Sequence, residues 1–364
     1  MRAAVYTETG DPGDVLHVTE VGEPHAGPGQ VRIAVRAAGV NPIDWKIVGG
    51  LRGSSPDHPT VPGIDAAGVV DEVGPEVTGV QVGNAVFGHA AGGSAAEYAV
   101  LSAWAPKPPG TPFEVAGGLP VAGETAVRVL DLLGLQSGQT VVVDGASGGV
   151  GIATVQVAVA RGLVVIGTAG EANQDFVRSL GALPTRYGAG LVDRVRALAP
   201  SGVDGGVDTA GRGSVRDLVE LTGNPARVVT IADFTAGELG VQVTTGGGGQ
   251  AARLAEVAEL LAAGRFPAVG RREGRCGKRA HSGCAGRAPA RSCRSPCRSP
   301  GPTTSWSAPC TRGSAAARRR WCSAAAFRGA STPGCGHRSR TATSPGRSST
   351  GISTSAWWSR ARPG

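Results

Sequence analysis

The sequence predicts an α/β protein in which an irregular β-barrel precedes a doubly wound parallel sheet. Two observations predict this fold class. Up to about residue 119, short strand-like runs are separated by turns rich in glycine and proline, such as Gly27-Pro28-Gly29. From Val121 onward, short apolar runs alternate with amphipathic segments, which is the pattern of parallel strands covered by helices. We therefore expect two domains, at residues 1–120 and 121–268.

Each expected strand of the barrel is a short apolar or β-branched run between turn residues. These strands are residues 3–6, 30–37, 68–73, 84–87 and 96–100. In the second domain, buried apolar runs are predicted as strands, and longer segments with one apolar face are predicted as helices. In chain order these are helix 124–133, strand 140–143, helix 149–160, strand 163–168, helix 175–180, strand 206–208, helix 214–221, strand 227–231 and helix 251–263.

The chain changes its composition near residue 270. Of its 36 Lys and Arg and 28 Asp and Glu, residues 1–270 hold 17 and 27, whereas residues 271–364 hold 19 and one. All seven cysteines lie from Cys276 onward, so residues 1–270 contain neither a disulfide framework nor a cysteine-ligated zinc site. Residues 271–364 have no Val or Leu and cannot bury enough apolar surface to fold by themselves. We expect residues 269–364 to form a disordered, basic, low-complexity tail.

The tail has the composition of a gene read out of frame. Almost all of its residues are Ala, Pro, Ser, Thr, Arg, Gly, Cys and Trp, whose codons have G or C as the middle base. Residues 1–270, the body of the chain, have 15 Arg but only two Lys, as expected of a GC-rich gene in which third codon positions are mostly G or C. A frameshift moves these third positions to the middle, so we infer an insertion or deletion near residues 266–270.

Two alternatives for the tail stay open. Its arginines and tryptophans could form an arm that binds nucleic acid. We favour this explanation of the tail less than the frameshift. Its cysteines could be metal ligands, although the spacing Cys293-x3-Cys297 matches no zinc motif well.

Two features lead us to expect a cytoplasmic protein without a membrane partner. The first residues lack an uninterrupted apolar core of signal-peptide length. The most apolar region, residues 141–166, is interrupted by Asp144, Arg161 and several glycines, so we do not expect it to cross a membrane.

A glycine-rich turn between an apolar strand and a helix is the main sign of a binding site. The strand is residues 140–143, the helix follows the turn, and a second strand lies at residues 163–168. A pyrophosphate can approach the backbone only where no Cβ intrudes, and the start of a helix offers free N–H groups and a favourable dipole. The residues that we expect to hold a cofactor pyrophosphate are Gly145, Ala146, Ser147, Gly148, Gly149, Val150 and Gly151. The alternative is a tight turn that serves packing alone.

The end of the second strand indicates which dinucleotide binds. A site for NAD is expected to have an acidic side chain there, which binds the ribose 2′-hydroxyl and repels a 2′-phosphate. The chain instead has Thr168, Ala169 and Gly170, with Glu171 one position further. We therefore expect NADPH, with Thr168 among the cofactor contacts and NADH as the less favoured cofactor.

Four segments of the body follow one another in a recognisable order. They are residues 39–46 (GVNPIDWK), 62–70 (PGIDAAGVV), 120–126 (PVAGETA) and 145–151 (GASGGVG). In this order and spacing, they resemble the zinc-independent medium-chain dehydrogenases/reductases of the quinone oxidoreductase type. The resemblance covers about residues 1–268 and implies a GroES-like barrel that carries catalysis, a Rossmann domain that binds the cofactor, and a homodimer. It also implies a return of the chain to the barrel domain where the tail now begins, so the closing strands of that domain are expected to be missing.

The resemblance further implies that the site holds no zinc. Zinc-dependent relatives have a Cys at or near the position of Asn41 and a His at that of Ile64, so a thiolate–imidazole site cannot be built from this body. Asp44 is expected to hold the loop that contains Asn41, and Asp65 is expected to be structural. The histidines at positions 17, 25, 58 and 89 lack the spacing of ligands, and we expect them at the surface or in turns.

Hydride transfer without a metal needs hydrogen-bond donors at the oxygen that gains negative charge. The resemblance places Asn41 and Lys46 in the loop over the nicotinamide, and we expect both to be catalytic. The alternatives are a helix-cap or turn role before proline for Asn41 and a solvated surface position for Lys46. The resemblance also places Thr125 near the nicotinamide and Tyr187 near the adenosine phosphate. Ile231 is expected at the cofactor because it ends a strand at the carboxyl edge of the sheet.

The activity that the resemblance implies is NADPH-dependent hydride transfer to a quinone or an α,β-unsaturated carbonyl compound. Two alternatives remain open, an enoyl reductase that acts on a polyketide-like enone and a non-catalytic protein that binds NADPH. The expected partners are a small-molecule substrate and a second copy of the chain.

The gene itself tests the inferred frameshift. We expect the DNA across codons 260–275 to carry an insertion or deletion, because the residues downstream have the composition of a GC-rich gene read out of frame. Resequencing of this stretch checks the expectation, and a single frame with no apolar alternative reading downstream contradicts it.

Overall fold

The computed structural model describes residues 1–53 and 56–266. The expected tail, residues 269–364, and the end of the expected second domain, residues 267–268, lie outside the described residues.

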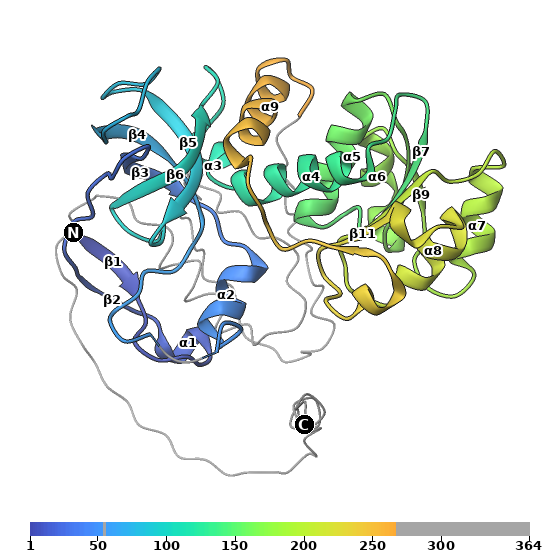
Figure 1. Ribbon diagram of the computed structural model, residues 1–364, viewed down its shortest axis with the longest axis horizontal. Helices are drawn as coiled ribbons and strands as arrows, with labels where there is room; N and C mark the ends of the chain where they lie inside the picture. Colours follow the sequence, from blue (N-terminus) through green and yellow to red (C-terminus); the bar gives the residue numbers. More distant parts are fainter. Residues whose placement is uncertain (54–55, 267–364) are drawn as a thin grey trace, which may run out of the picture. The chain divides into compact units, whose positions relative to one another are not determined.

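The first part of the chain forms a closed β-barrel (Figure 1). Its four strands are antiparallel and follow one another in the order β3-β4-β5-β6, while β1 and β2 pair separately. In β3, Val31 and Ile33 are fully buried, and Arg32 between them is held by Asp71, with 2.9 Å from Arg32 Nη2 to Asp71 Oδ2. This alternation is the two-residue period of a strand that has one face in a core. The elements are β1 (Arg2–Val5), α1 (Pro12–Val15), β2 (His17–Glu20), β3 (Val31–Ala38), α2 (Pro42–Val48), β4 (Asp65–Val73), β5 (Ala85–Ala91), β6 (Tyr98–Pro106) and α3 (Phe113–Ala116).

The second part forms a parallel sheet of six strands in the order β12-β11-β10-β7-β8-β9. The chain builds outward from β7 through β8 to β9 and then returns to the other side of β7 with β10. The loops after β7 and β10 therefore lie at the point where the strand order reverses, which is where sheets of this kind bind ligands. The elements are α4 (Pro120–Leu133), β7 (Thr140–Asp144), α5 (Gly149–Ala160), β8 (Val164–Thr168), η1 (Glu171–Asn173), α6 (Gln174–Ser179), β9 (Leu183–Thr185), α7 (Leu191–Leu198), β10 (Gly205–Asp208), α8 (Val215–Thr222), η2 (Pro225–Arg227), β11 (Val228–Thr230), η3 (Ala236–Leu239), β12 (Gln242–Val243) and α9 (Gln250–Ala262).

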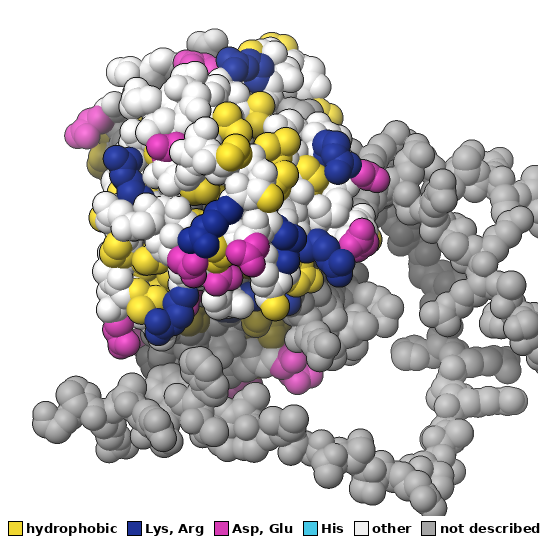
Figure 2. All heavy atoms as spheres, turned by 90° about the vertical axis from the view of Figure 1, so that its right-hand side faces the viewer, with side chains coloured by type: hydrophobic (Ala, Val, Ile, Leu, Met, Phe, Trp, Pro, Cys, Tyr) yellow, Lys and Arg dark blue, Asp and Glu magenta, His cyan; other side chains and the backbone are white. Residues whose placement is uncertain are grey.

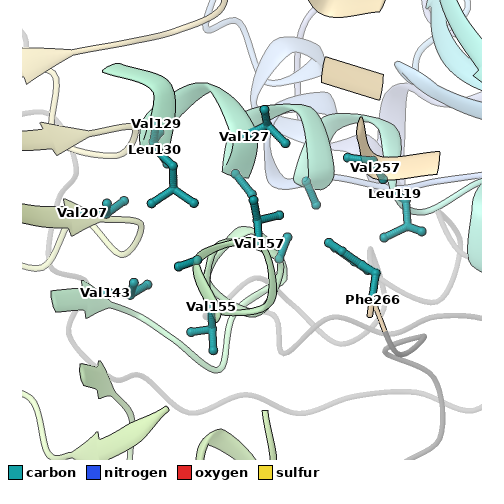
Figure 3. Close-up of a cluster of buried hydrophobic side chains, with 14 of the residues drawn as sticks. Leu119, Val127, Val129, Leu130, Val143, Val155, Val157, Val207, Val257 and Phe266 are labelled. Atoms are coloured by element: carbon teal, nitrogen blue, oxygen red, sulfur yellow. The ribbon is translucent and has the colours of Figure 1, made fainter. Parts of the chain in front are cut away.

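Helix α5 lies in the centre of the largest hydrophobic core. Figure 3 shows Val155 and Val157 on this helix, among side chains from α4, the parallel sheet and α9. The helix is mostly apolar, and residues 151–158 are all buried, as expected of a helix that other elements surround over most of its length. Each fully buried valine contributes about 1.5–3 kcal/mol, so this core fixes the helix that follows the glycine-rich turn.

The predicted fold class is confirmed, and α5 has the predicted bounds. Several short elements were not predicted, among them α2, α7, β9 and β12. The two-residue strand β12 and the three-residue strand β9 are too short to show a hydrophobic period. The division of the body at residue 120 stays a prediction.

Charges of both signs are mixed on the face of the second domain that Figure 2 shows. One ion pair joins α7 and α8, and the distance from Arg196 Nη2 to Glu220 Oε1 is 3.1 Å. Among the described residues, no helix has both the length and the apolar character that crossing a membrane requires.

Candidate functional site

The glycine-rich turn joins β7 to α5 through close backbone contacts. Gly145 has a φ of +80°, and a Cβ there would lie 2.7 Å from Thr209 Oγ1 in the loop after β10. A Cβ at Gly151 would lie 2.1 Å from the carbonyl oxygen of Gly145. Both glycines are therefore required by packing, because a side chain at either position would push the turn away from its neighbours.

Thr168 holds this turn in place from the end of β8. Its Oγ1 accepts a hydrogen bond from the Gly145 amide at 3.0 Å and donates to the buried carboxylate of Asp144. The Ala146 amide donates to the Thr168 carbonyl oxygen at 3.0 Å. Ser214 Oγ donates to the other Asp144 oxygen at 2.7 Å. Thr168 is fully buried, so the structure gives its hydroxyl a supporting position, and direct contact with a cofactor stays a prediction.

Four backbone amides at the start of α5 have no hydrogen-bond acceptor within the described part of the chain. They belong to Ser147, Gly149, Val150 and Gly151. The capping residue, Gly148, offers no side chain, and an ideal Cβ at Gly149 has no atom within 4 Å. Free amides, an open backbone surface and the positive end of a 12-residue helix dipole are what a pyrophosphate requires. These residues fit the pyrophosphate of a dinucleotide.

Polar groups gather beside the turn at the ends of β8 and β9. Asn173 Nδ2 donates to Ser147 Oγ at 3.3 Å, and a Cβ at Gly170 would lie 3.7 Å from the Tyr187 hydroxyl. Tyr187 is 57% exposed. The structure therefore brings Tyr187 close to the segment that follows Thr168, and its contact with the adenosine phosphate stays a prediction.

Arg186 is a member of this group that the sequence did not indicate. Its Nη1 lies 3.3 Å from Glu171 Oε2, and both side chains are largely exposed. No sequence pattern pointed to Arg186, because strand β9, which positions it, is only three residues long and was not predicted. An acidic residue that could repel a 2′-phosphate is thus paired with a guanidinium.

Asn41 lies at the start of α2 and connects that helix to the barrel. Its backbone amide donates to Asp44 Oδ2 at 2.7 Å, and its Nδ2 donates to Asp65 Oδ2 at 2.8 Å. Asp65 Oδ1 in turn accepts from the Val121 amide at 2.7 Å. One hydrogen of the side-chain amide of Asn41 is therefore donated to Asp65, and the second hydrogen of that Nδ2 is available to a ligand.

Lys46 lies on the exposed side of α2. Its Nζ is 6.0 Å from the centre of the Trp45 ring, and Trp45 is 39% exposed. Within the described residues, no hydrogen bond joins Lys46 to Asn41, and each of the two predicted catalytic residues has other neighbours. The catalytic role of each stays a prediction.

Two buried carboxyl groups accompany Asn41. Burial raises the pKa of Asp44 to about 7, while the backbone hydrogen bond from Asn41 lowers it less. Burial also raises the pKa of Asp65 to about 8 against its hydrogen bonds from Asn41 and Val121, and the charge of Asp44 adds to the increase. Asp44 Oδ1 has no hydrogen-bond partner among the described residues.

Thr125 and Ile231 occupy the region between the barrel and the sheet. Thr125 is 6% exposed on α4, and its Oγ1 accepts a hydrogen bond from Arg128 Nη2 at 3.1 Å. Ile231 follows β11, is partly buried against the main core, and its amide donates to the Asp208 carbonyl oxygen at 3.1 Å. Ile231 therefore lies at the carboxyl edge of the sheet, where folds of this kind bind ligands. The contact of Thr125 and of Ile231 with a cofactor stays a prediction.

The expectation that His89 is a surface or turn residue was wrong. His89 is 6% exposed and belongs to β5, directly opposite Asp65 of β4. The predicted strand stopped at residue 87, because Gly88 broke the apolar pattern. In the described ranges, no three His, Cys, Asp or Glu side chains come together as a metal site.

The barrel and the parallel sheet, connected by α4, define a two-domain protein of the medium-chain dehydrogenase class. Residues 27–119 match the GroES-like domain of alcohol dehydrogenases. The quinone oxidoreductase of Mus musculus is 33% identical over 241 residues, which cover 64% of this chain and 73% of that protein. The chain belongs to the medium-chain dehydrogenases/reductases of the quinone oxidoreductase type.

Two further proteins are similar to this chain. The spectinabilin polyketide synthase system protein NorB of Streptomyces orinoci is 44% identical over 159 residues, which cover 42% of this chain but only 7% of NorB. A mycobacterial protein solved as a complex with NADPH is 27% identical with a TM-score of 0.62, covering 73% of this chain and 90% of that one. The chain thus matches a small section of NorB and most of the mycobacterial protein.

Replacing Gly149 by alanine is expected to weaken NADPH binding by about tenfold or more, which corresponds to ~1.4 kcal/mol. The added methyl group would enter the open side of the turn, whereas the fold should be unaffected because nothing lies within 4 Å of that position. Titration of NADPH fluorescence measures the affinity. Gly22→Ala is the matched control, since its Cβ also meets nothing within 4 Å, and equal affinities of the two variants would contradict the pyrophosphate assignment.

Stability is expected to fall as pH rises from about 4 to about 7. The folded state holds the Asp44 proton up to about pH 7, whereas the unfolded chain releases it near pH 4, so unfolding is favoured by each increase of pH in this range. Asp44→Asn removes this titration and should reduce the dependence by on the order of 2–4 kcal/mol across the range, while Asp65, whose pKa is also raised, keeps the remaining slope. Urea unfolding at several pH values measures it. Asp57→Asn, at an exposed carboxyl, should keep the wild-type slope, and an equally steep slope for Asp44→Asn contradicts the prediction.

Proposed function

We propose that the protein is an NADPH-dependent oxidoreductase that transfers hydride, without zinc, to a quinone or an α,β-unsaturated carbonyl compound. The observation that carries the proposal is the set of four free amides at the start of α5, at the switch point of the sheet. The similarity to a mouse quinone oxidoreductase supports the reaction class. The similarity to a mycobacterial protein complexed with NADPH supports the cofactor.

The pair of Arg186 and Glu171 supports NADPH over NADH. A 2′-phosphate carries about two negative charges and pairs well with a planar guanidinium. Arg186 lies beside Tyr187 at the end of β9, and its charge offsets that of Glu171, which lies 3.3 Å away. We propose that Arg186 and Tyr187 bind the adenosine phosphate. Ser147 completes that end of the site, and Thr168 supports the turn beside it.

The bound cofactor would supply a hydride, and the residues of this chain would orient the reactants and stabilise charge. The amides of the glycine-rich turn hold the pyrophosphate, while Thr125 and Ile231 lie toward the reactive end. The remaining hydrogen of the Asn41 amide is the donor proposed for the oxygen that gains negative charge. Lys46 is proposed as a second, solvent-side donor. The absence of cysteine from residues 1–270 supports chemistry without a zinc–thiolate site.

Two other functions are kept as alternatives. An enoyl reductase that acts on a polyketide-like enone is favoured by the 44% identity to part of NorB. A non-catalytic NADPH-binding protein is favoured by the geometry at α2, where Asn41 is engaged with Asp65 and Lys46 is exposed. We also propose that the protein is a homodimer, as the resemblance to its family implies, and that it is cytoplasmic, as its first residues and the interrupted apolar region 141–166 indicate.

The recorded chain is expected to be poorly soluble or inactive, because the closing strands of the barrel domain are missing from it. Oxidation of NADPH by the frame-corrected protein, with a panel of quinones and enones, therefore tests the proposal. We expect turnover of at least one class of acceptor, because the site offers both a dinucleotide cradle and an oxyanion donor. The preferred acceptor distinguishes quinone reduction from enoyl reduction. Binding of NADPH without turnover would indicate the non-catalytic alternative, and failure to bind either NADPH or NADH would refute the proposal.

Replacing Arg186 by alanine is expected to raise the Kd for NADPH by about 10- to 100-fold and to leave that for NADH almost unchanged. The lost interaction is a charge-assisted bond to the 2′-phosphate, which corresponds to ~1.5–3 kcal/mol. Arg196→Ala is the control, because Arg196 is similarly exposed and also pairs with a glutamate, Glu220. Equal losses of affinity for NADPH and NADH in the Arg186 variant would contradict this assignment.

A further inference from the structure

A buried ionic cluster on α4 and α9 holds more positive than negative charge. Glu124, on α4, is 3% exposed and accepts from two arginines, with 3.2 Å to Arg128 Nε and 2.7 Å to Arg253 Nε. Arg253 comes from α9, and the side chains of Arg128 and Arg253 are 9% and 16% exposed. Among the described residues, no other carboxylate forms an ion pair with either arginine. The cluster therefore keeps one unbalanced positive charge, which is costly to bury unless another group pairs with it.

The donors of Arg128 are in use, whereas one donor of Arg253 is not. Arg128 Nη1 donates to Thr244 Oγ1, and Arg128 Nη2 donates to Thr125 Oγ1 at 3.1 Å. Arg253 Nη2 donates to the Gly248 carbonyl oxygen. Arg253 Nη1 has no acceptor among the residues that the structure describes. Because a guanidinium can only donate hydrogen bonds, this nitrogen needs an acceptor from outside the described chain.

The segment that leads into α9 has an open backbone beside this guanidinium. Residues 246–249 are all glycine, and a Cβ on residues 246–248 would meet no atom within 4 Å. A Cβ on Gly249 would lie 3.2 Å from Arg253 Nη1. None of the backbone amides of residues 245–252 has an acceptor in the described ranges. The start of this 13-residue helix thus offers unused N–H groups and the positive end of the helix dipole next to an unused guanidinium donor.

A buried histidine is an independent sign that a ligand binds here. His89, on the barrel strand β5, is 6% exposed, and its Nε2 has no hydrogen-bond partner among the described residues. Helix α9 packs against β6, the strand beside β5 (Figure 1). Burial is the main cause that lowers the pKa of His89, and the charges of Glu124, Arg128 and Arg253 also act on it, so the ring lies near the cluster. A buried ring nitrogen without a partner indicates a polar group that the chain itself does not supply.

The cluster lies on the other side of β7 from the adenosine end of the proposed cofactor site. Thr244 follows β12, and its amide donates to the Thr230 carbonyl oxygen at 3.1 Å, at the carboxyl end of β11. In the strand order β12-β11-β10-β7-β8-β9, the glycine-rich turn follows β7 and Arg186 follows β9. The cluster is therefore available to a second ligand at the edge where sheets of this kind bind ligands.

We propose that Arg253, the unused amides of residues 245–252 and His89 bind a carboxylate group of the acceptor substrate, so that the enzyme prefers acceptors with an acid group. The inference rests on the proposed function, because it assigns a chemical class to the acceptor of that reaction. A carboxylate carries one negative charge and balances the one unpaired positive charge of the cluster. A phosphate monoester, with about two negative charges, would exceed it. Bonds between a guanidinium and a carboxylate are also among the strongest hydrogen bonds in proteins.

Calorimetric titration of the frame-corrected protein, with NADPH bound, tests the proposal without turnover. The ligands are 6-oxoheptanoate, a saturated keto acid, and its methyl ester. We expect the acid to bind about tenfold or more tightly than the ester. Arg253→Gln leaves Glu124 and Arg128 to balance each other, so it should raise the Kd of the acid about tenfold and leave that of the ester unchanged. Arg196→Gln is the matched control, because Arg196 pairs with a glutamate at the surface and should keep wild-type values.

Gly248→Ala tests the open backbone while all charges stay in place. The added methyl group would cover part of the open segment, and the fold should be kept because no atom lies within 4 Å of that position. We expect the Kd of 6-oxoheptanoate to rise about tenfold and that of the methyl ester to stay the same. Gly22→Ala, whose Cβ also meets nothing within 4 Å, should bind both ligands as the wild type does.

Steady-state assays extend the test to turnover. The acceptors are 6-oxohept-4-enoate, its methyl ester and 1,4-naphthoquinone, which has no acid group. We expect Arg253→Gln to lower kcat/KM for the acid about tenfold and to leave that for 1,4-naphthoquinone unchanged.

Three outcomes overturn the proposal. They are equal affinities of the wild type for the acid and the ester, an unchanged affinity of Arg253→Gln for the acid, and tighter binding of inorganic phosphate than of acetate to the NADPH-bound protein. Turnover of 1,4-naphthoquinone by the wild type beside any of these results keeps the proposed function intact. If the wild type does not bind NADPH, the proposed function fails, and this proposal fails with it.

Discussion

The buried carboxyl group of Asp65 connects the parts on which the site depends. It accepts from Asn41 at the start of α2 and from the Val121 amide at the start of α4, so one side chain of the barrel fixes two helices. Because α4 also packs on α5 in the main core, the position of the glycine-rich turn relative to the barrel depends on this group. A second buried group, Asp144, has the same function within the sheet, where it fixes Thr168 and Ser214.

These anchors limit which polar groups are available for chemistry. Asn41 and Thr168, both predicted as site residues, are partly or wholly engaged in holding the backbone. Thr125 differs because its oxygen is engaged while its hydrogen is free. The distribution of committed and uncommitted donors, more than the identity of the residues, determines what the space between barrel and sheet can bind.

The fold class, helix α5 and the glycine-rich turn could be predicted from the sequence, because they depend on local patterns of apolar residues and glycines. The sequence was not sufficient for Arg186, His89 or the cluster around Glu124. Arg186 follows a strand of three residues, His89 lies beyond a glycine within β5, and Arg253 meets Glu124 from a helix 129 residues away. Contacts of this kind depend on the packing of distant elements, and a single sequence carries no periodic signal for them.

The open backbone at Gly149 has a consequence for how the protein could change. Since main-chain amides rather than side chains would hold the diphosphate, that attachment persists through most substitutions around it. In the proposed function, the choice between the two coenzymes would lie instead with side chains at the ends of β8 and β9, including the exposed Arg186. Affinity and coenzyme preference would then be carried by separate parts of the chain, so that a few surface exchanges could alter the second without loss of the first.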